Sequence, residues 1–239
     1  LFMRLNKFLA HAGVASRRQS DALIQKATTF VNGELIIDPA YPVTETDDIV
    51  FEGIKLSISK KSQIILFHKP IKVVTTTFDP QGRTIVLDYV KTRDRIFPIG
   101  RLDRMTTGLL LLTNDGELSN KLLHPKFRIP RIYEAEIDNI LDLKTINKIA
   151  KGIFIGEGEF GRAEVLKQKK VKKRSTVHLK LFTGKKREIR RIFSFLSIRL
   201  FSLKRIQYGP IFLGELPCGE WRNLNNAEMN QLKTFNRSK

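Results

Sequence analysis

The sequence predicts an α+β fold, in which a small helix-and-hairpin domain precedes a larger domain of mixed strands and short helices. Two observations indicate the small domain: apolar residues recur at helical spacing near the start of the chain, and an Asn-Gly pair between apolar residues follows them. Farther along, apolar and β-branched runs alternate with capped helical segments. Residues 59–63 are polar and unpatterned. We therefore expect domains at residues 3–58 and 64–239, joined by a linker at 59–63.

Composition limits the class of protein. The chain has 43 Lys and Arg against 24 Asp and Glu, a formal net charge of +19, which favours nucleic acid as a partner over an anionic membrane surface. No apolar stretch is long enough to cross a bilayer, and the first residues lack the apolar core of a secretory signal. The single cysteine, Cys218, and the scattered histidines give no disulfide or metal-ligand pattern. We expect a cytoplasmic monomer without a metal or a membrane partner.

The first helices follow from apolar spacing and capping. Apolar residues three and four positions apart predict a helix over residues 4–12, which Gly13 ends. Ser16, with Gln19 three residues later, makes a capping box and predicts a second helix over residues 17–26. The buried side of this second helix is expected to comprise Leu23, Ala27 and Ile24.

A hairpin and a basic surface complete the small domain. Asn32-Gly33 is a strong turn signal, and strands are expected at 49–51 and 55–58. Basic side chains lie off the apolar faces of the two helices, where they could follow a phosphate backbone: Arg4, Lys7, Arg17, Arg18 and Lys26. The charge pattern alone leaves an ordinary solvated basic face equally open.

The larger domain begins with strands. Apolar and β-branched runs predict three of them, at 64–67, 72–78 and 95–99, and Pro98 favours an edge position for the third. Thr84 is expected to cap a short helix between the second and third strands.

The most informative stretch runs from Gly100 to Gly116. Asp103 stands between Arg101 and Arg104, ahead of an uninterrupted leucine run that must be buried. A carboxylate at the mouth of a dry apolar wall, with cations beside it, is poorly hydrated and suited to nucleophilic or base chemistry. The alternative is a turn aspartate before a core strand. The stretch alone leaves both interpretations open.

The rest of the chain supplies an inward tyrosine and an arginine-rich helix. Alternation in residues 131–137 predicts a strand with Tyr133 on its inward face. A helix beginning near residue 187 has an apolar face, while its arginines, Arg187, Arg190 and Arg191, project elsewhere. The remaining expected elements are helices at 114–123, 142–151 and 225–235, strands at 153–155, 160–168, 176–182 and 199–206, and a basic loop at 169–174.

Absent motifs shorten the list of possible reactions. The sequence has no phosphate-binding P-loop and no dinucleotide-binding glycine motif. Metal-dependent nucleases normally gather several carboxylates, whereas Asp103 stands alone in its stretch. A single carboxylate beside a basic groove fits an isomerisation at a base more easily than strand cleavage.

Five separated motifs, in order, resemble those of RNA pseudouridine synthases that act on ribosomal RNA (the RsuA type). They are Lys69-Pro70, the Gly-Arg-Leu-Asp stretch with its Thr-Thr-Gly-Leu-Leu-Leu-Leu continuation, Arg131-Ile132-Tyr133, Arg187-Glu188-Ile189-Arg190-Arg191, and Gly219-Glu220-Trp221-Arg222. The first 57 residues or so are similar to the small RNA-binding domain named after a small-subunit ribosomal protein. The resemblance covers essentially the whole chain, although Ile129-Pro130 stands where the family often has a charged residue.

The resemblance implies a two-lobed, mostly antiparallel mixed-sheet catalytic domain with the active-site cleft between the lobes. Asp103 would be the catalytic carboxylate, Tyr133 would stack on the target base, and Arg190 would pair with Asp103. No cofactor is consumed in the family's reaction, and the partner would be ribosomal RNA or an assembling ribosomal subunit. Further RNA contacts are expected from Arg101, Arg104, Lys185, Arg187 and Arg191. The alternatives are a non-catalytic RNA-binding or ribosome-assembly protein, which would need none of the three catalytic residues, and a basic DNA-binding protein.

Overall fold

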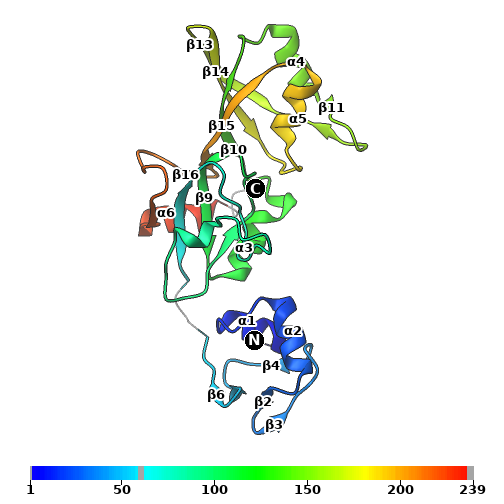
Figure 1. Ribbon diagram of the computed structural model, residues 1–239, viewed down its shortest axis with the longest axis vertical. Coiled ribbons are helices and arrows are strands. Elements are labelled where there is room, and N and C mark those ends of the chain that lie inside the picture. Colours follow the sequence, from blue (N-terminus) through cyan, green and yellow to red (C-terminus); the bar gives the residue numbers. More distant parts are fainter. Residues whose placement is uncertain (1, 59–61, 236–239) are drawn as a thin grey trace. The chain divides into compact units, whose positions relative to one another are not determined.

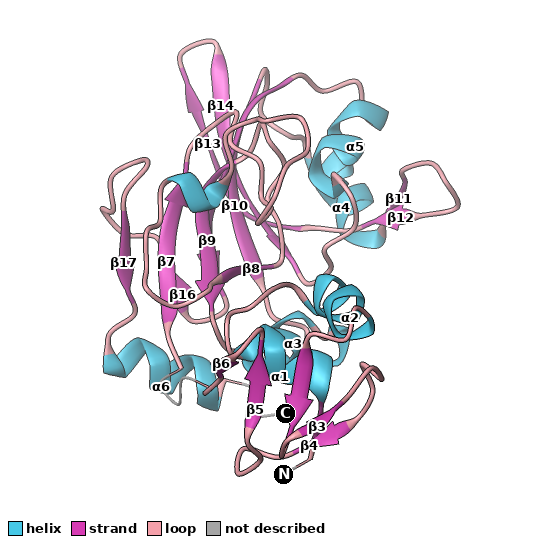
Figure 2. Cartoon of the chain, turned by 60° about the horizontal axis from the view of Figure 1, so that its bottom comes forward, coloured by secondary structure: helices cyan, strands magenta, loops and turns pink. Residues whose placement is uncertain are grey.

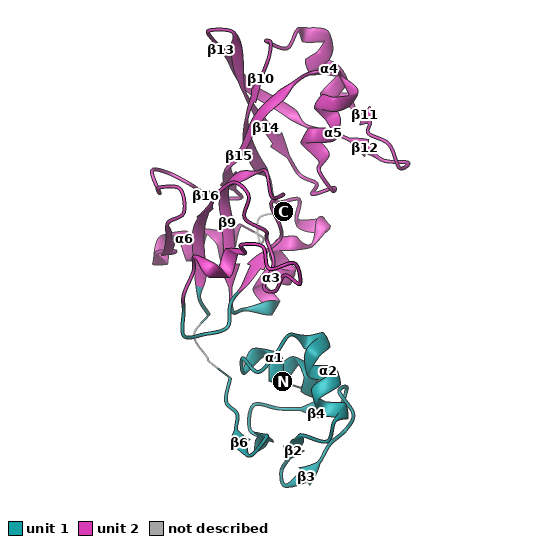
Figure 3. Ribbon diagram, in the orientation of Figure 1, with its two compact units in different colours: residues 1–63, 92–96, 114–116 teal, residues 64–91, 97–113, 117–239 magenta. Residues whose placement is uncertain are grey.

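The computed structural model describes residues 2–58 and 62–235 of the chain (Figure 1). Helices and strands occur along its whole length (Figure 2). The chain divides into two compact units, which Figure 3 colours separately. Unit 1 comprises residues 1–63, 92–96 and 114–116, and unit 2 comprises residues 64–91, 97–113 and 117–239.

Unit 1 combines two short helices with short antiparallel strands. The helices are α1 Leu5–His11 and α2 Arg17–Gln25. The strands are β1 Met3–Arg4, β2 Thr29–Val31, β3 Glu34–Leu35, β4 Pro42–Val43, β5 Ile49–Phe51 and β6 Ile54–Lys55. They pair in the orders β3-β2-β5-β6 and β1-β4. The core consists of buried apolar side chains from both helices and the strands, among them Leu5, Phe8, Leu9, Ile24, Val31, Val43 and Ile49.

The local signals of unit 1 are confirmed. Ser16 Oγ accepts a hydrogen bond from Gln19 N (3.3 Å), and Ser16 N donates to Gln19 Oε1 (3.2 Å), so both halves of the capping box form. Asn32 and Gly33 both have positive φ, +51° and +85°, as a two-residue turn between twisted strands requires. These two residues therefore set the register of β2 against β3.

The buried side of α2 was predicted partly wrongly. Ile24 is fully buried, whereas Leu23 is half-buried and Ala27 is exposed. The helix ends at Gln25, and Ala27 has φ of +57°, so it no longer follows the helical face. A helix shorter than the apolar pattern therefore leaves the last predicted core position in solvent.

Unit 2 is built on one large sheet. Its helices are α3 Gly116–Leu123, α4 Leu143–Lys151, α5 Glu188–Phe195 and α6 Asn226–Thr234, with short 3-10 turns η1 Val86–Asp88 and η2 Pro125–Phe127. The strands are β7 Ile64–Lys69, β8 Phe97–Ile99, β9 Thr107–Thr113, β10 Arg131–Ile137, β11 Ile153–Phe154, β12 Phe160–Gly161, β13 Glu164–Val171, β14 Arg174–Leu181, β15 Leu200–Tyr208, β16 Ile211–Phe212 and β17 Trp221–Asn223.

The sheet is mixed but mostly antiparallel, which confirms the predicted fold class. In the described part of the chain it has nine strands, ordered β13-β14-β10-β15-β9-β7-β17, with β16 beside β15 and β8 beside β9. Figure 2 shows β7 beside β9, and in the order of the sheet β15 lies between β9 and β10. All pairs are antiparallel except β15 with β9, which pair in parallel through Lys204 with Thr107 and Arg205 with Gly108. This short parallel junction joins the two halves of the sheet.

Each half of the sheet has its own hydrophobic core. One core gathers residues of β10, β14, α4 and α5, including Ala135, Val177, Ile149, Ile189 and Ile192. Figure 1 shows α4 and α5 together near β11. The other core gathers residues of β7, β9, α3 and α6, including Leu66, Leu109, Leu111, Leu122 and Leu232. Strand β15 contributes Leu203 to the first core and Tyr208 to the second. The unit therefore has two lobes on one continuous sheet.

The leucine run is confirmed as a buried strand. Leu109, Leu110, Leu111 and Leu112 are fully buried in β9, which pairs with β7 from Gly108 to Thr113. The edge position of Pro98 is also confirmed, because β8 pairs with β9 on one side and with no other described strand. Both outcomes follow from local chemistry: leucines require burial on both faces, and proline cannot donate to a neighbouring strand.

The strand predicted at 72–78 is wrong. Lys72 has φ of +67°, and Val74 forms only an isolated bridge with Ile85. The Thr75 hydroxyl donates a hydrogen bond to the Leu102 carbonyl oxygen, and the Thr76 hydroxyl donates one to the Phe78 carbonyl oxygen. High β propensity is therefore overridden by threonine side chains that bond to loop backbone.

Two further expectations are corrected. The basic segment 169–174 is not a loop, because β13 runs to Val171, β14 starts at Arg174, and a tight turn at Lys172 with φ of +56° joins them. The helix after Thr84 is only the 3-10 turn η1, and Ile85 rather than Thr84 precedes it.

Most of the linker predicted at 59–63 lies outside the described residues. Within those residues, no helix is long and apolar enough to span a membrane.

The junction of β9 and β15 makes a stability prediction. Gly108 has φ of +104°, and a Cβ at this position would lie 2.2 Å from the Arg205 carbonyl oxygen. Gly108→Ala should lower the free energy of unfolding by about 2–4 kcal/mol, because overpacking adds to backbone strain. Urea denaturation of both proteins measures this.

The matched control is Gly214→Ala. Gly214 also has positive φ (+59°), but nothing lies within 4 Å of an added Cβ, so a loss of only about 1 kcal/mol is expected. If both variants lose the same free energy of unfolding, the close approach of β9 and β15 at Gly108 does not limit which residue fits there.

Candidate active site

A cavity of about 880 Å³ lies in unit 2 and is lined by residues from both cores. Ala163, Ile189 and Leu203 belong to one core, and Leu122 and Tyr208 belong to the other. The three predicted catalytic residues all line this cavity: Asp103, Tyr133 and Arg190. The structure therefore brings together three side chains that are far apart in the sequence.

The loop that carries Asp103 is fixed by the irregular segment 72–75. Thr75 Oγ1 donates to the Leu102 carbonyl oxygen (2.9 Å) and accepts from Leu102 N (3.3 Å). Lys72 N donates to the Arg104 carbonyl oxygen (2.7 Å). Because these bonds flank Asp103 on both sides, the segment that fails to form a strand instead holds the carboxylate in place.

Arg190 holds the other side of the same loop. Its Nη2 donates to the Met105 carbonyl oxygen (2.6 Å) and to Thr106 Oγ1 (3.3 Å), and its Nε lies 3.8 Å from Asp103 Oδ2. The Asp103 side chain is 32% exposed and that of Arg190 17%. Burial, and then the neighbouring Arg187, lower the pKa of Arg190, whereas Asp103 raises it. The guanidinium thus joins α5 to the carboxylate loop.

Tyr133 is half-buried on β10. It packs against the core that contains Ala135 and Ile137, which confirms the predicted inward face of this strand. Its partner across the β10–β15 ladder is Arg205. Directly opposed residues of paired strands share a face, so the tyrosine ring and Arg205 lie on the cavity side of the sheet together.

Lys69 does not line the cavity, but its amine is close enough to feel the charge of Asp103. Sequence reasoning quoted it as part of a motif and gave it no role. It is fully buried at the end of β7, and its Nζ donates to the carbonyl oxygens of Pro70 and Val73, both at 2.8 Å. Burial lowers the pKa of Lys69 to about 8, against the opposing pull of the Asp103 charge. The sequence signal was available: a lysine ends a strand whose other residues are nearly all apolar.

The predicted RNA-contacting residues are distributed unevenly. Arg101, Lys185 and Arg187 line the cavity. Arg104 is exposed and does not line it, and its Nε donates to the Lys72 carbonyl oxygen (3.3 Å). In unit 1, Arg4, Arg17, Arg18 and Lys26 are exposed and Lys7 is half-buried. Sequence reasoning missed further cations that line the cavity, namely Arg128, Arg131, Arg162, Lys180 and Arg205.

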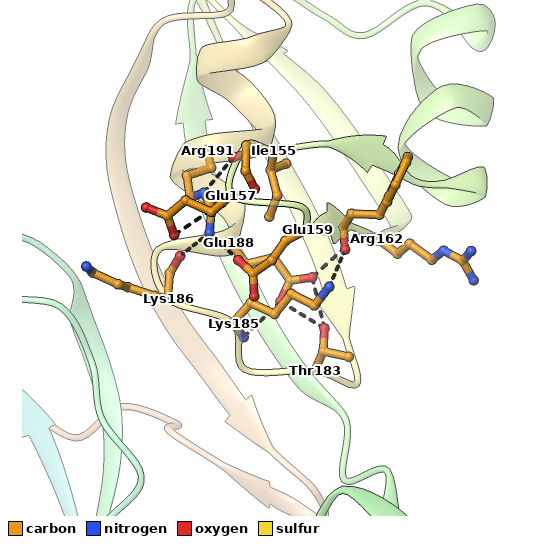
Figure 4. Close-up of polar contacts among 11 residues, drawn as sticks. Ile155, Glu157, Glu159, Arg162, Thr183, Lys185, Lys186, Glu188 and Arg191 are labelled. Carbon is orange, nitrogen blue, oxygen red and sulfur yellow. Dashed lines mark hydrogen bonds and ion pairs between the residues drawn. The ribbon is translucent and has the colours of Figure 1, made fainter.

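Arg191 contacts the β11–β12 hairpin, and its predicted contact with RNA stays a prediction. Its guanidinium donates to the carbonyl oxygens of Ile155 and Gly156, both at 2.7 Å, and pairs with Glu159 (Figure 4). These acceptors belong to the β11–β12 hairpin and the turn between its strands. The arrangement gives Arg191 a structural task, to hold α5 against this hairpin, and does not place it in the cavity lining.

Glu188 completes the same network. The side chain is 5% exposed and accepts hydrogen bonds from Thr183 Oγ1 (2.8 Å), Lys185 N (3.2 Å) and Arg162 N (3.2 Å) (Figure 4). A buried carboxylate with this many donors is well satisfied. It fixes the start of α5, from which Arg187 and Arg190 extend.

The arrangement can perform a specific kind of chemistry. One carboxylate, one aromatic ring and several cations face a cavity large enough for an extruded nucleotide. The cations suit a phosphate backbone, the ring suits stacking on a base, and the carboxylate suits attack or proton abstraction at the sugar. Among the described residues, no group of three or more His, Cys, Asp or Glu could hold a metal ion.

Comparison with known proteins identifies the family. Residues 63–195 match the family described as RNA pseudouridylate synthase, and residues 3–49 match the S4 domain. The chain is 38% identical over 235 residues to ribosomal large subunit pseudouridine synthase B of Bacillus subtilis, covering 97% of this chain and 96% of that protein. It is 32% identical to the protein of the same name from Yersinia pestis, covering 96% and 75%. A crystal structure of a pseudouridylate synthase superposes with a TM-score of 0.67 at 26% identity, covering 96% and 99%.

The fold and the matches define an isomerase that acts on RNA. The chain belongs to the RNA pseudouridylate synthase family and carries an amino-terminal S4 domain. The family that the five motifs indicated is thereby confirmed.

The buried lysine makes a prediction about pH. The folded pKa of Lys69, about 8, lies below its ordinary value of 10.5, so between these values the unfolded chain binds a proton that the folded protein does not. The contribution of Lys69 to the free energy of unfolding should therefore increase as pH rises from about 8 to 10.5. Urea unfolding of the wild type and Lys69→Met at pH 7.5 and 9.5 measures the difference.

The control is Lys144→Met on the exposed side of α4. Its difference from the wild type should be the same at both pH values. A pH-independent difference for Lys69→Met would contradict the assignment of a lowered pKa to this buried amine.

The network at the start of α5 makes a second prediction. Glu188→Gln replaces one accepting oxygen with an amide that would face backbone N–H donors, so it should lower the free energy of unfolding by about 1–3 kcal/mol. Thermal and urea denaturation measure this effect.

Glu157→Gln on the same hairpin is the control, because the Glu157 side chain is 77% exposed and its ion pair with Arg191 is 3.8 Å long. An effect within about 0.5 kcal/mol is expected there. Equal effects would show that Glu188 does not anchor the helix.

Proposed function

We propose that this enzyme converts uridine in ribosomal RNA to pseudouridine, and that large-subunit RNA is the first substrate to test. The names of the Bacillus subtilis and Yersinia pestis relatives support this substrate. The net charge of +19 supports a polyanionic partner. The observation that carries the proposal is the gathering of Asp103, Tyr133 and Arg190 around one cavity, with Asp103 and Arg190 3.8 Å apart.

The reaction exchanges one bond to the sugar for another. The bond between uracil N1 and ribose C1′ breaks, the detached uracil turns, and a bond forms between its C5 and C1′. C5 then loses its proton and N1 gains one, so substrate and product are isomers. No net oxidation occurs, and no co-substrate is needed for atoms or electrons to balance.

We assign each residue one task in this reaction. Asp103 either attacks C1′ or promotes loss of a ribose proton to give a glycal, and both routes need a poorly hydrated carboxylate. Tyr133 stacks on the extruded base. Arg190 orients Asp103, which its position between that carboxylate and the Met105 carbonyl oxygen supports.

The remaining basic residues bind the RNA backbone in this proposal. Residues 3–58 form the S4-type RNA-binding domain, residues 59–63 the linker and residues 64–239 the catalytic domain. The exposed Arg17 and Arg18 on α2 suit phosphate contacts. All three proposed catalytic residues line one cavity of a single chain, which supports action as a monomer. Action on ribosomal RNA would place the enzyme in the cytoplasm.

Asp103→Asn tests the proposal directly. The variant should lower kcat by at least about 10²-fold, since loss of a general base alone costs about 10²–10⁴-fold. RNA binding should change little, because the cations that line the cavity remain. Pseudouridine formed in ribosomal RNA transcripts is the measurement, and mapping RNA from cells with and without the gene identifies the uridine.

Asp138→Asn is the matched control. Asp138 follows β10 and does not line the cavity, so this variant should keep wild-type activity. Pseudouridine formation by Asp103→Asn at the wild-type rate would overturn the assignment of the catalytic carboxylate. A wild-type protein that binds ribosomal RNA and modifies none of its uridines would favour the non-catalytic binding role.

A further inference from the structure

Arg205 is a buried cation whose charge is left unpaired. Its side chain is 2% exposed in the middle of β15. Its Nε donates to the Leu109 carbonyl oxygen (2.7 Å), and its Cζ lies 5.3 Å from the centre of the Tyr208 ring. Its Nη2 is buried without a hydrogen-bond partner in the described part of the chain. No acidic side chain of that part lies within 4.0 Å of it.

Other arginines of the same chain show what a satisfied guanidinium looks like. Arg222 makes two hydrogen bonds of 2.7 Å to Glu228, although it is far more exposed. Arg191 has two backbone carbonyl oxygens and a carboxylate. A buried arginine stays charged, and buried charges are normally paired because an unpaired one is costly. The unpaired guanidinium of Arg205 therefore indicates an acceptor from outside the chain.

The position of Arg205 beside Tyr133 and Asp103 indicates what kind of group would accept its hydrogen bond. Arg205 lines the same cavity as Asp103. On one side it pairs in register with Tyr133 of β10, and on the other with Gly108 of β9. Directly opposed residues share a face of the sheet, so the cation lies beside the ring that is proposed to stack on the base. The acceptor is thus a group of the target base.

We propose that Arg205 is a further catalytic residue, whose guanidinium donates to a carbonyl oxygen of the target uracil and stabilises its negative charge while the base is detached. This inference rests on the proposed function. When the N1–C1′ bond breaks, its electron pair stays on uracil and spreads onto N1, O2 and O4. The same pair forms the new C5–C1′ bond, and the base is neutral again once that bond has formed. C5 then loses its proton and N1 gains one, which leaves the charge unchanged.

The role does not depend on how Asp103 acts. If Asp103 attacks C1′, uracil leaves as an anion, and if a ribose proton is lost to give a glycal, uracil again leaves as an anion. A fixed and buried cation favours this state more than the neutral uridine, which is the condition for catalysis. The Nε bond to Leu109 holds the guanidinium in place before the substrate arrives.

A purely structural role predicts different results. If Arg205 only ties β15 to β9 through Leu109, its replacement should weaken folding and lower RNA binding and turnover together. If it stabilises the departing base, its replacement should lower kcat and leave KM almost unchanged. Arg205→Lys retains the positive charge and should recover part of the lost rate, whereas Arg205→Gln should not.

The experiment compares kcat and KM of the wild type, Arg205→Gln, Arg205→Lys and Lys204→Gln. The substrate is a ribosomal RNA fragment that contains the uridine converted by the wild type. For Arg205→Gln we expect kcat to fall about 10²- to 10³-fold, as for loss of one donor to a developing oxyanion. Lys204 is the neighbour on the opposite face of β15 and does not line the cavity, so its variant should keep wild-type kcat. A folded Arg205→Gln with kcat within threefold of the wild type would overturn the inference.

A second measurement applies even if Arg205→Gln fails to fold. RNA that carries 6-azauridine at the target position presents a base that ionises in the neutral pH range. The wild type should bind this RNA more tightly as pH rises through that ionisation, relative to RNA with uridine, and Arg205→Lys should retain the gain. No gain for the wild type would overturn the inference. A wild type that forms no pseudouridine in any ribosomal RNA would instead refute the proposed function.

Discussion

Strands β9 and β15 approach each other so closely at Gly108 that no side chain fits between their backbones. This short parallel pairing joins the two halves of the sheet, and the functional residues are positioned from it. Asp103 stands just before β9, and Tyr133 lies across the β10–β15 ladder from Arg205. The position of the carboxylate relative to the ring therefore depends on backbone packing at the junction and on the hydrogen bonds that segment 72–75 and Arg190 make to the Asp103 loop. A site built on strands in this way is held more precisely than one built on loops alone.

The excess of positive charge is divided among different tasks. The guanidinium of Arg191 makes contacts that anchor α5. The guanidinium of Arg190 donates to the Met105 carbonyl oxygen and lies close to Asp103. Arg205 is buried, and none of the described carboxylates pairs with it. Arg101 and Arg187 line the cavity and are exposed, so they are available to a polyanion. The net charge alone indicates that the partner is a polyanion. The contacts of each guanidinium indicate which arginines are free to bind that partner.

Much of the local structure was predictable because it depends on neighbours in sequence. The capping box at Ser16, the turn at Asn32-Gly33 and the buried leucines of β9 all follow from residues a few positions apart. Some predictions failed for local reasons, such as the early end of α2 before Ala27 and the tight turn at Lys172. The strand predicted at 72–78 failed because segment 72–75 bonds to the distant loop before β9. The contacts of Arg191 with the β11–β12 hairpin are also distant in the sequence. Neither partner is visible in a local pattern, because side-chain hydrogen bonds of this kind compete with regular structure.

The sequence by itself determined the α+β fold, the family and the candidate residues Asp103, Tyr133 and Arg190, since motif order and apolar periodicity are properties of the chain. Only the tertiary structure decided that these three line one cavity, that Lys69 is fully buried, and that no described acidic side chain pairs with Arg205. The physical reason is desolvation. Whether a cation is solvated, paired or left for a ligand depends on what the fold packs around it, and much of that packing comes from segments far away in the sequence.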